Sequence, residues 1–211
     1  MKLIGMLDSP YVRRVAVSFQ LLGIPFEHQS LSVFRTFDQF RKINPVVKAP
    51  TLVCDDGEVL MDSTLILEYG EAIAVKGRSL MPKGRAELQH ALHIIGLALA
   101  ATEKSVQIVY EHNTRPPERQ HKPWLDRVTG QTLSAYEVLE ADIRRRPLAT
   151  TSDAIDQAGI ATAIAWEFTQ KMIPQSVPAA EFPLLAAHSA ACEKLAAFDA
   201  APHGDGTCKA A

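Results

Sequence analysis

The chain has 211 residues, enough for one large domain or two modest ones, and its formal net charge at pH 7 is −2. Its composition, with 47% hydrophobic and 22% charged residues, is typical of a soluble globular protein. The charge gives no electrostatic reason to expect nucleic acid or an anionic membrane as a partner, and no apolar run approaches the roughly 20 residues that span a bilayer.

The N-terminus and the cysteines indicate a cellular compartment. The first residues, MKLIGMLDSPYVRR, contain only a short apolar piece before charges appear, so they do not resemble a signal peptide. Cys54, Cys192 and Cys208 share neither CxxC nor metal-ligand spacing. We therefore expect a cytoplasmic protein with reduced thiols and no metal site. His90 and His93 fall on one helical face, but no third ligand at suitable spacing completes a set.

The first part of the chain alternates strand and helix patterns. KLIGML predicts a strand, and DSP then predicts a helix that is capped by Ser9 and ends at Gly23. PFEHQSL predicts a second strand and FDQFRKIN a short helix. PTLVCDD and EVLMD predict a hairpin around an Asp-Gly turn, and Ser63 is the expected cap of a helix over STLILEYGEAIAV. This order predicts a small sheet, parallel at one end and antiparallel at the other.

Strand patterns disappear after this region. Residues 76–85, rich in Gly, Pro and Lys, predict an interdomain linker, so the expected domains are 1–77 and 84–211. Helices are expected over 86–112 and 118–146, separated by the prolines of NTRPPERQ. Asp153, with Asp156 three residues later, is the expected cap of an almost wholly apolar central helix. A last helix is expected over PAAEFPLLAAHSAACEKLAAF, before a frayed polar tail, HGDGTCKAA.

Four short motifs together resemble the cytosolic glutathione S-transferase family, in particular its serine-type, bacterial-like members. SPYVRR is similar to the family's Ser-Pro-aromatic-x-x-Arg opening, and NPVVKAPTL to its Asn-Pro-x-x-Lys-x-Pro-x-Leu segment. LMDSTLILEY is similar to the Asp/Glu-Ser-x-x-Ile-x-x-Tyr segment, and Asp153-x-x-Asp156 to the Ser/Thr-x-x-Asp box of the central helix. The resemblance implies an α/β thioredoxin-like N-terminal domain, an all-α C-terminal domain and a homodimer. Gly70 departs from the family's apolar residue and is expected to loosen its helix.

The resemblance also implies glutathione as co-substrate and Ser9 as the catalytic residue. A thiol reacts as its thiolate, and its ordinary pKa is about 8.5. A serine hydroxyl is too weak a base to remove the thiol proton. It can donate a hydrogen bond to the sulfur at the positive end of a helix, which lowers the pKa of the thiol. The alternative is that Ser9 only caps its helix.

Six further residues are implied in binding glutathione. Ser63 would hold the γ-glutamyl carboxylate at a helix N-terminus, and Asp62 would face the ammonium group or only brace the site. Ala49 would pair its backbone with the cysteinyl part, beside a cis peptide bond to the following proline. Lys48, with Arg35 as a further candidate, would bind the glycyl carboxylate. The complete implied set is Arg35, Lys48, Ala49, Pro50, Asp62 and Ser63.

The expected function is a glutathione transferase-like enzyme. It would add the thiolate to a small electrophile, or use it to reduce a peroxide, with the electrophile near 106–110. Two alternatives stay open: a non-catalytic binding module of the same fold, and a glutathione-dependent isomerase or dehalogenase. The sequence does not identify the electrophile, because substrate choice depends on side chains with no transferable code. The role of Arg14, the motif arginine, is also open.

Overall fold

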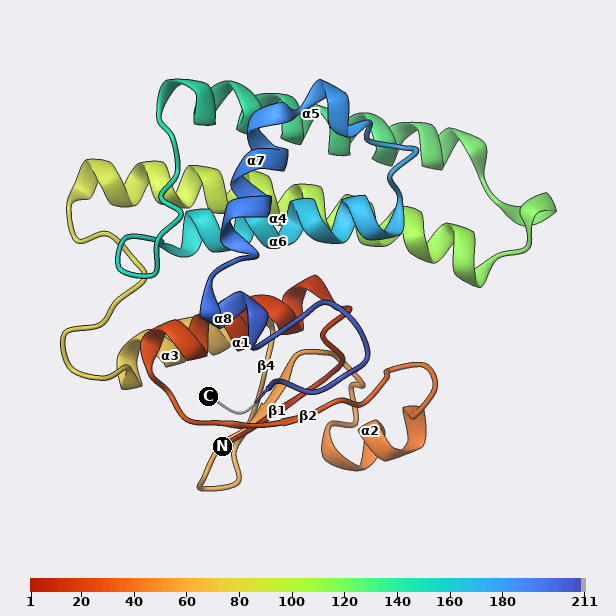
Figure 1. Cartoon of the computed structure of the whole chain (residues 1–211). Coiled ribbons are helices and arrows are strands. Elements are labelled where there is room, and N and C mark those ends of the chain that lie inside the picture. Colours follow the sequence, from red (N-terminus) through yellow and green to blue (C-terminus); the bar gives the residue numbers. More distant parts are fainter. Residues whose placement is uncertain (210–211) are drawn as a thin grey trace. The chain divides into compact units, whose positions relative to one another are not determined.

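The computed structural model describes residues 1–209 and divides into two compact units (Figure 1). The first unit comprises Met1–Leu80 together with 194–209, and the second comprises Met81–Glu193. The boundary near residue 80 lies within the expected linker. The division differs from the expected one because 194–209 join the sheet unit instead of continuing the helical unit.

A four-stranded sheet forms the centre of the first unit. Its strands are β1 (Lys2–Ile4), β2 (Glu27–Gln29), β3 (Thr51–Val53) and β4 (Val59–Met61), in the order β2-β1-β3-β4. β1 runs parallel to β2, whereas the other two pairs are antiparallel. The register places Leu3 opposite both His28 and Leu52. This arrangement confirms the expected mixed sheet, and with its helices it has a thioredoxin-like topology.

Three helices accompany this sheet: α1 (Pro10–Leu22), α2 (Phe37–Ile43) and α3 (Ser63–Ile73). α1 ends as predicted at Gly23, which has the left-handed φ of 69° that favours glycine. α1 and α3 pack closely, because a methyl group at Gly70 would lie 2.8 Å from a ring carbon of Phe19. The missing side chain at Gly70 thus makes room for Phe19, and the expected loosening of α3 by glycine stays a prediction.

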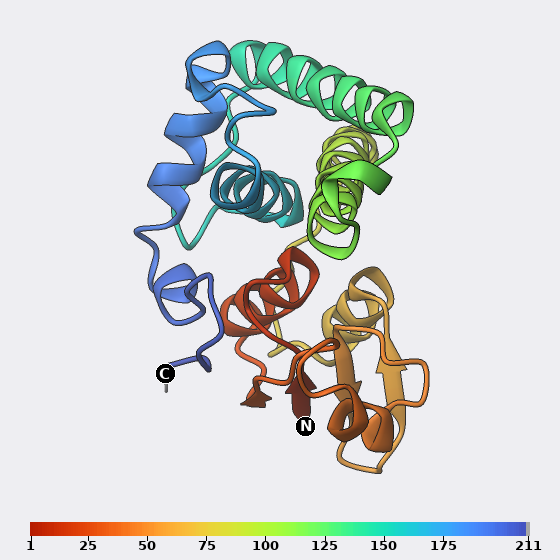
Figure 2. The same cartoon turned by 90° about the vertical axis from the view of Figure 1, so that its right-hand side faces the viewer.

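The second unit is wholly helical within the described residues. Its elements are α4 (Arg85–Thr114), η1 (Pro117–Arg119), α5 (Lys122–Arg145), α6 (Gln157–Met172), η2 (Ala179–Glu181) and α7 (Pro183–Cys192). Figure 2 shows α4, α5 and α7 around α6. α6 is buried along nearly its whole length, as its apolar composition predicts. Its cap is Asp156, which accepts the N–H of Gly159 at 3.0 Å, so the assignment to Asp153 is wrong.

α4 is long and apolar enough, by length and composition alone, to cross a bilayer. Its apolar residues Ile94, Ala98 and Ile108 are nevertheless buried inside the second unit. Burial of this kind is typical of the core helix of a helical domain.

The expected last helix is two helices in different units. α7 ends at Cys192, and the short α8 (Ala196–Asp199) packs against α1. The ring of Phe198 is fully buried beneath the guanidinium of Arg13, whose Nε donates to the carbonyl of Ala201 at 2.8 Å. The following residues are fixed by further hydrogen bonds, so the expectation of a frayed tail is wrong as far as residue 209. Residues 210 and 211 lie outside the described residues.

Candidate functional site

Ser9 lies between the end of β1 and the start of α1. Its Oγ accepts the backbone N–H of Val12 at 3.4 Å, as an N-cap does, and Pro10 occupies the first helical position. A hydroxyl group has two lone pairs and one hydrogen. The capping contact uses a lone pair, so the hydroxyl hydrogen of Ser9 remains available to a ligand at the positive end of α1.

The N-terminus of α3 carries Asp62 and Ser63. Asp62, and not Ser63, is the N-cap: its Oδ1 accepts the N–H of Thr64 at 2.9 Å. Asp62 has a positive φ of 75° with a ψ of 125°, outside the left-handed helical region, which is a sparsely populated conformation for a residue other than glycine. Ser63 is therefore the first helical residue, and its side chain is buried.

Arg14 reaches this helix end from α1. Its Nη1 donates to the Ser63 Oγ at 3.4 Å and to the Thr64 Oγ1 at 3.3 Å. Burial lowers the pKa of Arg14 to about 10, while the charge of Asp62 opposes this shift. Because a guanidinium only donates, Ser63 accepts from Arg14 and keeps its own hydroxyl hydrogen for a ligand. A role for Arg14 at this helix end, left open by the sequence, follows from these contacts.

The peptide bond between Ala49 and Pro50 is cis, as expected, immediately before β3. The segment lies against the end of β1, because a methyl group at Gly5 would lie 3.1 Å from the Cβ of Ala49. Within residues 1–209, no hydrogen bond of the protein uses the backbone N–H or C=O of Ala49. Lys48 is exposed, and its carbonyl accepts the hydroxyl of Thr51 at 2.7 Å.

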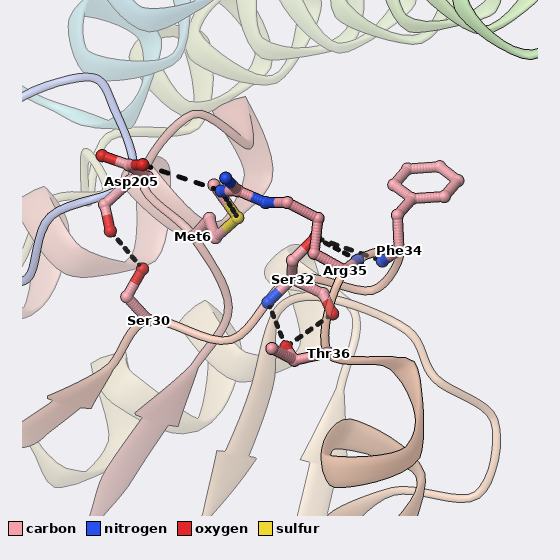
Figure 3. Close-up of polar contacts among 7 residues, drawn as sticks. All are labelled: Met6, Ser30, Ser32, Phe34, Arg35, Thr36 and Asp205. Atoms are coloured by element: carbon pink, nitrogen blue, oxygen red, sulfur yellow. Dashed lines mark hydrogen bonds and ion pairs between the residues drawn. The ribbon is translucent and has the colours of Figure 1, made fainter.

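Arg35 lies on the connection between β2 and α2. The hydroxyl oxygen of Ser32 accepts the backbone N–H groups of residues 34 and 35, which fixes the turn that carries Arg35. The Arg35 Nη2 donates to the Sδ of Met6 at 3.5 Å and lies 3.7 Å from the Oδ2 of Asp205 (Figure 3). Arg35 therefore lies beside the segment that leads from β1 to Ser9.

No sequence motif marks Asp8, beside Ser9, or two residues after α8 that have long-range interactions near it. Burial raises the pKa of the Asp8 carboxyl, whereas the charges of His203 and Arg35 lower it. His203 and Asp205 belong to the polar stretch that was expected to be frayed. No local pattern could have identified them, because their contacts join residues about 170 to 195 positions apart along the chain.

The other candidates belong to the second unit. Val106 and Tyr110 belong to α4 in the second unit, and their expected contact with an electrophile stays a prediction. The Nε2 of His90 lies 2.8 Å from the Oδ1 of Asp142. Among residues 1–209, no group of three or more His, Cys, Asp or Glu side chains is placed to hold a metal ion.

The sequence and the fold are similar to those of known proteins. Residues 3–76 match the family model of the glutathione S-transferase N-terminal domain. The uncharacterised GST-like protein YibF of Escherichia coli (strain K12) is 30% identical over 165 residues, which cover 78% of this chain and 80% of that protein. A maleylacetoacetate isomerase of Pseudomonas aeruginosa is 26% identical over 149 residues, covering 67% of this chain and 70% of that protein. A glutathione transferase family member of Pseudomonas fluorescens Pf-5, crystallised with bound glutathione, aligns with a TM-score of 0.81 and 29% identity, covering 95% of this chain and 97% of that one.

Proposed function

This chain belongs to the glutathione S-transferase family, and we propose that it is an enzyme that binds glutathione on the first unit and ionises its thiol at Ser9. The observation that carries the proposal is the geometry of Ser9, which caps α1 and retains a hydroxyl hydrogen. The glutathione-bound structure of the Pseudomonas fluorescens relative supports glutathione as the co-substrate.

The γ-glutamyl end of glutathione would bind at the N-terminus of α3. The Ser63 hydroxyl and the first free N–H groups of the helix would donate to its carboxylate, a favourable partner for a helix N-terminus. Arg14 supports this role because it occupies a lone pair of the Ser63 Oγ and adds positive charge nearby. Asp62 keeps one carboxylate oxygen outside its capping bond, available to the ligand's ammonium group.

The rest of the tripeptide would lie along the edge near Ala49. The unpaired backbone groups of Ala49 support an added-strand contact with the cysteinyl residue, beside Pro50. Lys48 and Arg35 supply positive charge for the glycyl carboxylate.

At the thiol, the chemistry requires no general base. The Ser9 hydroxyl donates a hydrogen bond to the thiolate, and the positive end of α1 also favours the negative sulfur. The thiol proton leaves to solvent. The thiolate then attacks an electrophilic carbon, and the reaction ends with loss of a leaving group or with protonation of the adduct. With a peroxide, attack on oxygen breaks the O–O bond and releases an alcohol or water, and the glutathione sulfenic acid that forms reacts with a second glutathione to give the disulfide and water.

A glutathione-dependent isomerase is the second candidate, favoured by the similarity to the maleylacetoacetate isomerase of Pseudomonas aeruginosa. In such a reaction, addition and loss of the thiolate leave glutathione unchanged. Identification of the product separates this reaction from conjugation. A homodimer, a cytoplasmic location and a small electrophilic substrate stay predictions.

The proposed site is tested by calorimetry of glutathione binding to the double variant Asp62→Asn/Ser63→Ala. Asparagine keeps the cap and tolerates the positive φ, so the change removes mainly a charge and a hydroxyl. Charged hydrogen bonds contribute about 1.5–3 kcal/mol each, so we expect affinity to fall at least tenfold.

The matched control is Ser152→Ala/Asp153→Asn, an exposed Ser-Asp pair in the second unit, which should leave the affinity unchanged. Unchanged affinity in the α3 double variant would show that the γ-glutamyl group binds elsewhere.

A further inference from the structure

The segment after α8 returns over the sheet unit as a closed loop. The backbone N–H of Lys209 donates to the carbonyl of Ala200 at 2.8 Å, and the Lys209 Nζ lies 2.7 Å from the Oδ1 of Asp199. Residues 200–209, here named the C-terminal loop, therefore have ends that meet. Compact surface loops of this kind are frequently functional.

Two hydrogen bonds attach the C-terminal loop to β2 and the connection that follows it. The Ser30 hydroxyl donates to the carbonyl of Asp205 at 2.7 Å (Figure 3), and the N–H of Cys208 donates to the Nδ1 of His28 at 3.0 Å. The other ring nitrogen of His28 lies 2.7 Å from the carbonyl oxygen of Gly5 and donates to it. The loop is thus fixed to the strand that leads to Arg35.

The carboxylate of Asp205 meets the guanidinium of Arg35 on one nitrogen only. The Asp205 Oδ2 and the Met6 Sδ both contact Nη2, which leaves the N–H groups of Nη1 and Nε available to another anion. Both charged side chains are mostly exposed, so the pair contributes little to stability. The pair instead orients the Arg35 guanidinium, because Asp205 and Met6 contact Nη2 while the N–H groups of Nη1 and Nε remain available.

The Arg35 guanidinium lies beside Met6, in the segment between β1 and Ser9 that belongs to the proposed glutathione site. Met6 accepts the backbone N–H of Ser9 at 3.2 Å, and the preceding Gly5 packs against Ala49. Burial raises the pKa of the Asp8 carboxyl, the residue before Ser9, and the charges of His203 and Arg35 oppose this shift.

We propose that the C-terminal loop is part of the glutathione site and that Asp205 is a positioning residue, which holds Arg35 with its free N–H groups ready for the glycyl carboxylate. The inference rests on the proposed function and adds a residue that no sequence motif marks. An arginine that is already oriented loses less side-chain freedom when the ligand binds.

The test compares two ligands by calorimetry with the full chain: glutathione, and glutathione esterified at the glycyl carboxylate. The variant Asp205→Asn should bind glutathione about 2- to 10-fold more weakly. The Arg35 side chain would then lose its conformational freedom only on binding, and this entropy loss reduces the free energy of binding. It should bind the ester with nearly the affinity of the unaltered protein. The control Asp38→Asn breaks another exposed aspartate–arginine pair of the first unit, with Arg41 at 3.3 Å, and should change neither affinity.

A second variant, Arg35→Lys, keeps the charge but lacks the planar fork, and it should show the same loss for glutathione and not for the ester. Equal weakening for both ligands in Asp205→Asn would indicate a general structural role and overturn the proposal, as would unchanged or tighter binding of glutathione. If the unaltered protein does not bind glutathione, the proposed function itself is wrong and this inference falls with it.

Discussion

A single hydroxyl group at Ser9 serves the helix and, in the proposed function, the thiolate. The capping contact to Val12 uses a lone pair, whereas the proposed contact to sulfur uses the hydrogen. The two roles therefore do not compete, and they affect different measurements.

We expect Ser9→Ala to raise the pKa of the bound glutathione thiol by about one to two units. This shift corresponds to losing a hydrogen bond to a charged group, about 1.5–3 kcal/mol. Ultraviolet difference titration of the thiolate measures the shift directly. Loss of the cap should in addition lower the free energy of unfolding by about 0.5–2 kcal/mol.

Ser9→Thr is the matched control, because threonine keeps both the hydroxyl and the capping oxygen. Identical titration curves for the unaltered protein and Ser9→Ala, with only a lower melting temperature, would show that Ser9 is a cap alone.

At the level of helices and strands, the packing of α1 against α3 depends on the absence of a side chain at Gly70. Two effects of Gly70→Ala oppose each other. Alanine raises intrinsic helix stability by about 1 kcal/mol, whereas a methyl group 2.8 Å from Phe19 overpacks the helix contact at a cost of about 1–3 kcal/mol. We expect a net loss in the free energy of unfolding, measured by denaturant titration.

Gly130→Ala in α5 provides the comparison, since a methyl group there would meet nothing within 4 Å. It should stabilise the protein slightly. A gain at Gly70 equal to the gain at Gly130 would contradict the close packing of α1 on α3.

The strands, the helices up to α6 and their order could be predicted because each follows a local pattern, whereas α7 and α8 were expected as one helix. The N-caps were harder to predict, since Asp62 and Ser63 are both good capping residues. The hydrogen bond from the Thr64 N–H to the Asp62 Oδ1, visible only in the folded structure, decides between them. The same ambiguity affected Asp153 and Asp156. The capping role of Ser9 could be predicted from its position before Pro10, and its catalytic role was implied only by the family resemblance. The contact of Asp205 with Arg35 could not be predicted, because it joins distant parts of the chain.

On the scale of the whole molecule, the first unit is discontinuous in sequence. Residues 194–209 complete it through Phe198, which is fully buried beneath Arg13. The expected second domain, 84–211, wrongly included residues 194–209, because α7 and α8 follow one continuous apolar helical pattern in the sequence. The helix ends at Cys192, and the chain rejoins the first unit from Lys194 onward.

Phe198→Ala should therefore destabilise the first unit, by about 3–5 kcal/mol as for other buried phenylalanines. Hydrogen exchange measures the effect by region, and we expect faster exchange in α1 and β1 than in the unaltered protein. Phe34→Ala, which removes a phenylalanine ring that is 61% exposed, should leave the exchange of α1 unchanged. Unaltered protection of α1 in Phe198→Ala would contradict the placement of α8.

The hydrogen bond between Arg13 and Ala201 has a consequence for biosynthesis, because it joins positions 188 residues apart. A ribosome makes α1 and the sheet early, but their last packing partners emerge only after the whole helical unit has been translated. Domain-by-domain folding from the N-terminus, the usual order during synthesis, is thus incomplete here. The surface of the nascent first unit that later covers Phe198 therefore stays exposed until residues 194–209 have been translated.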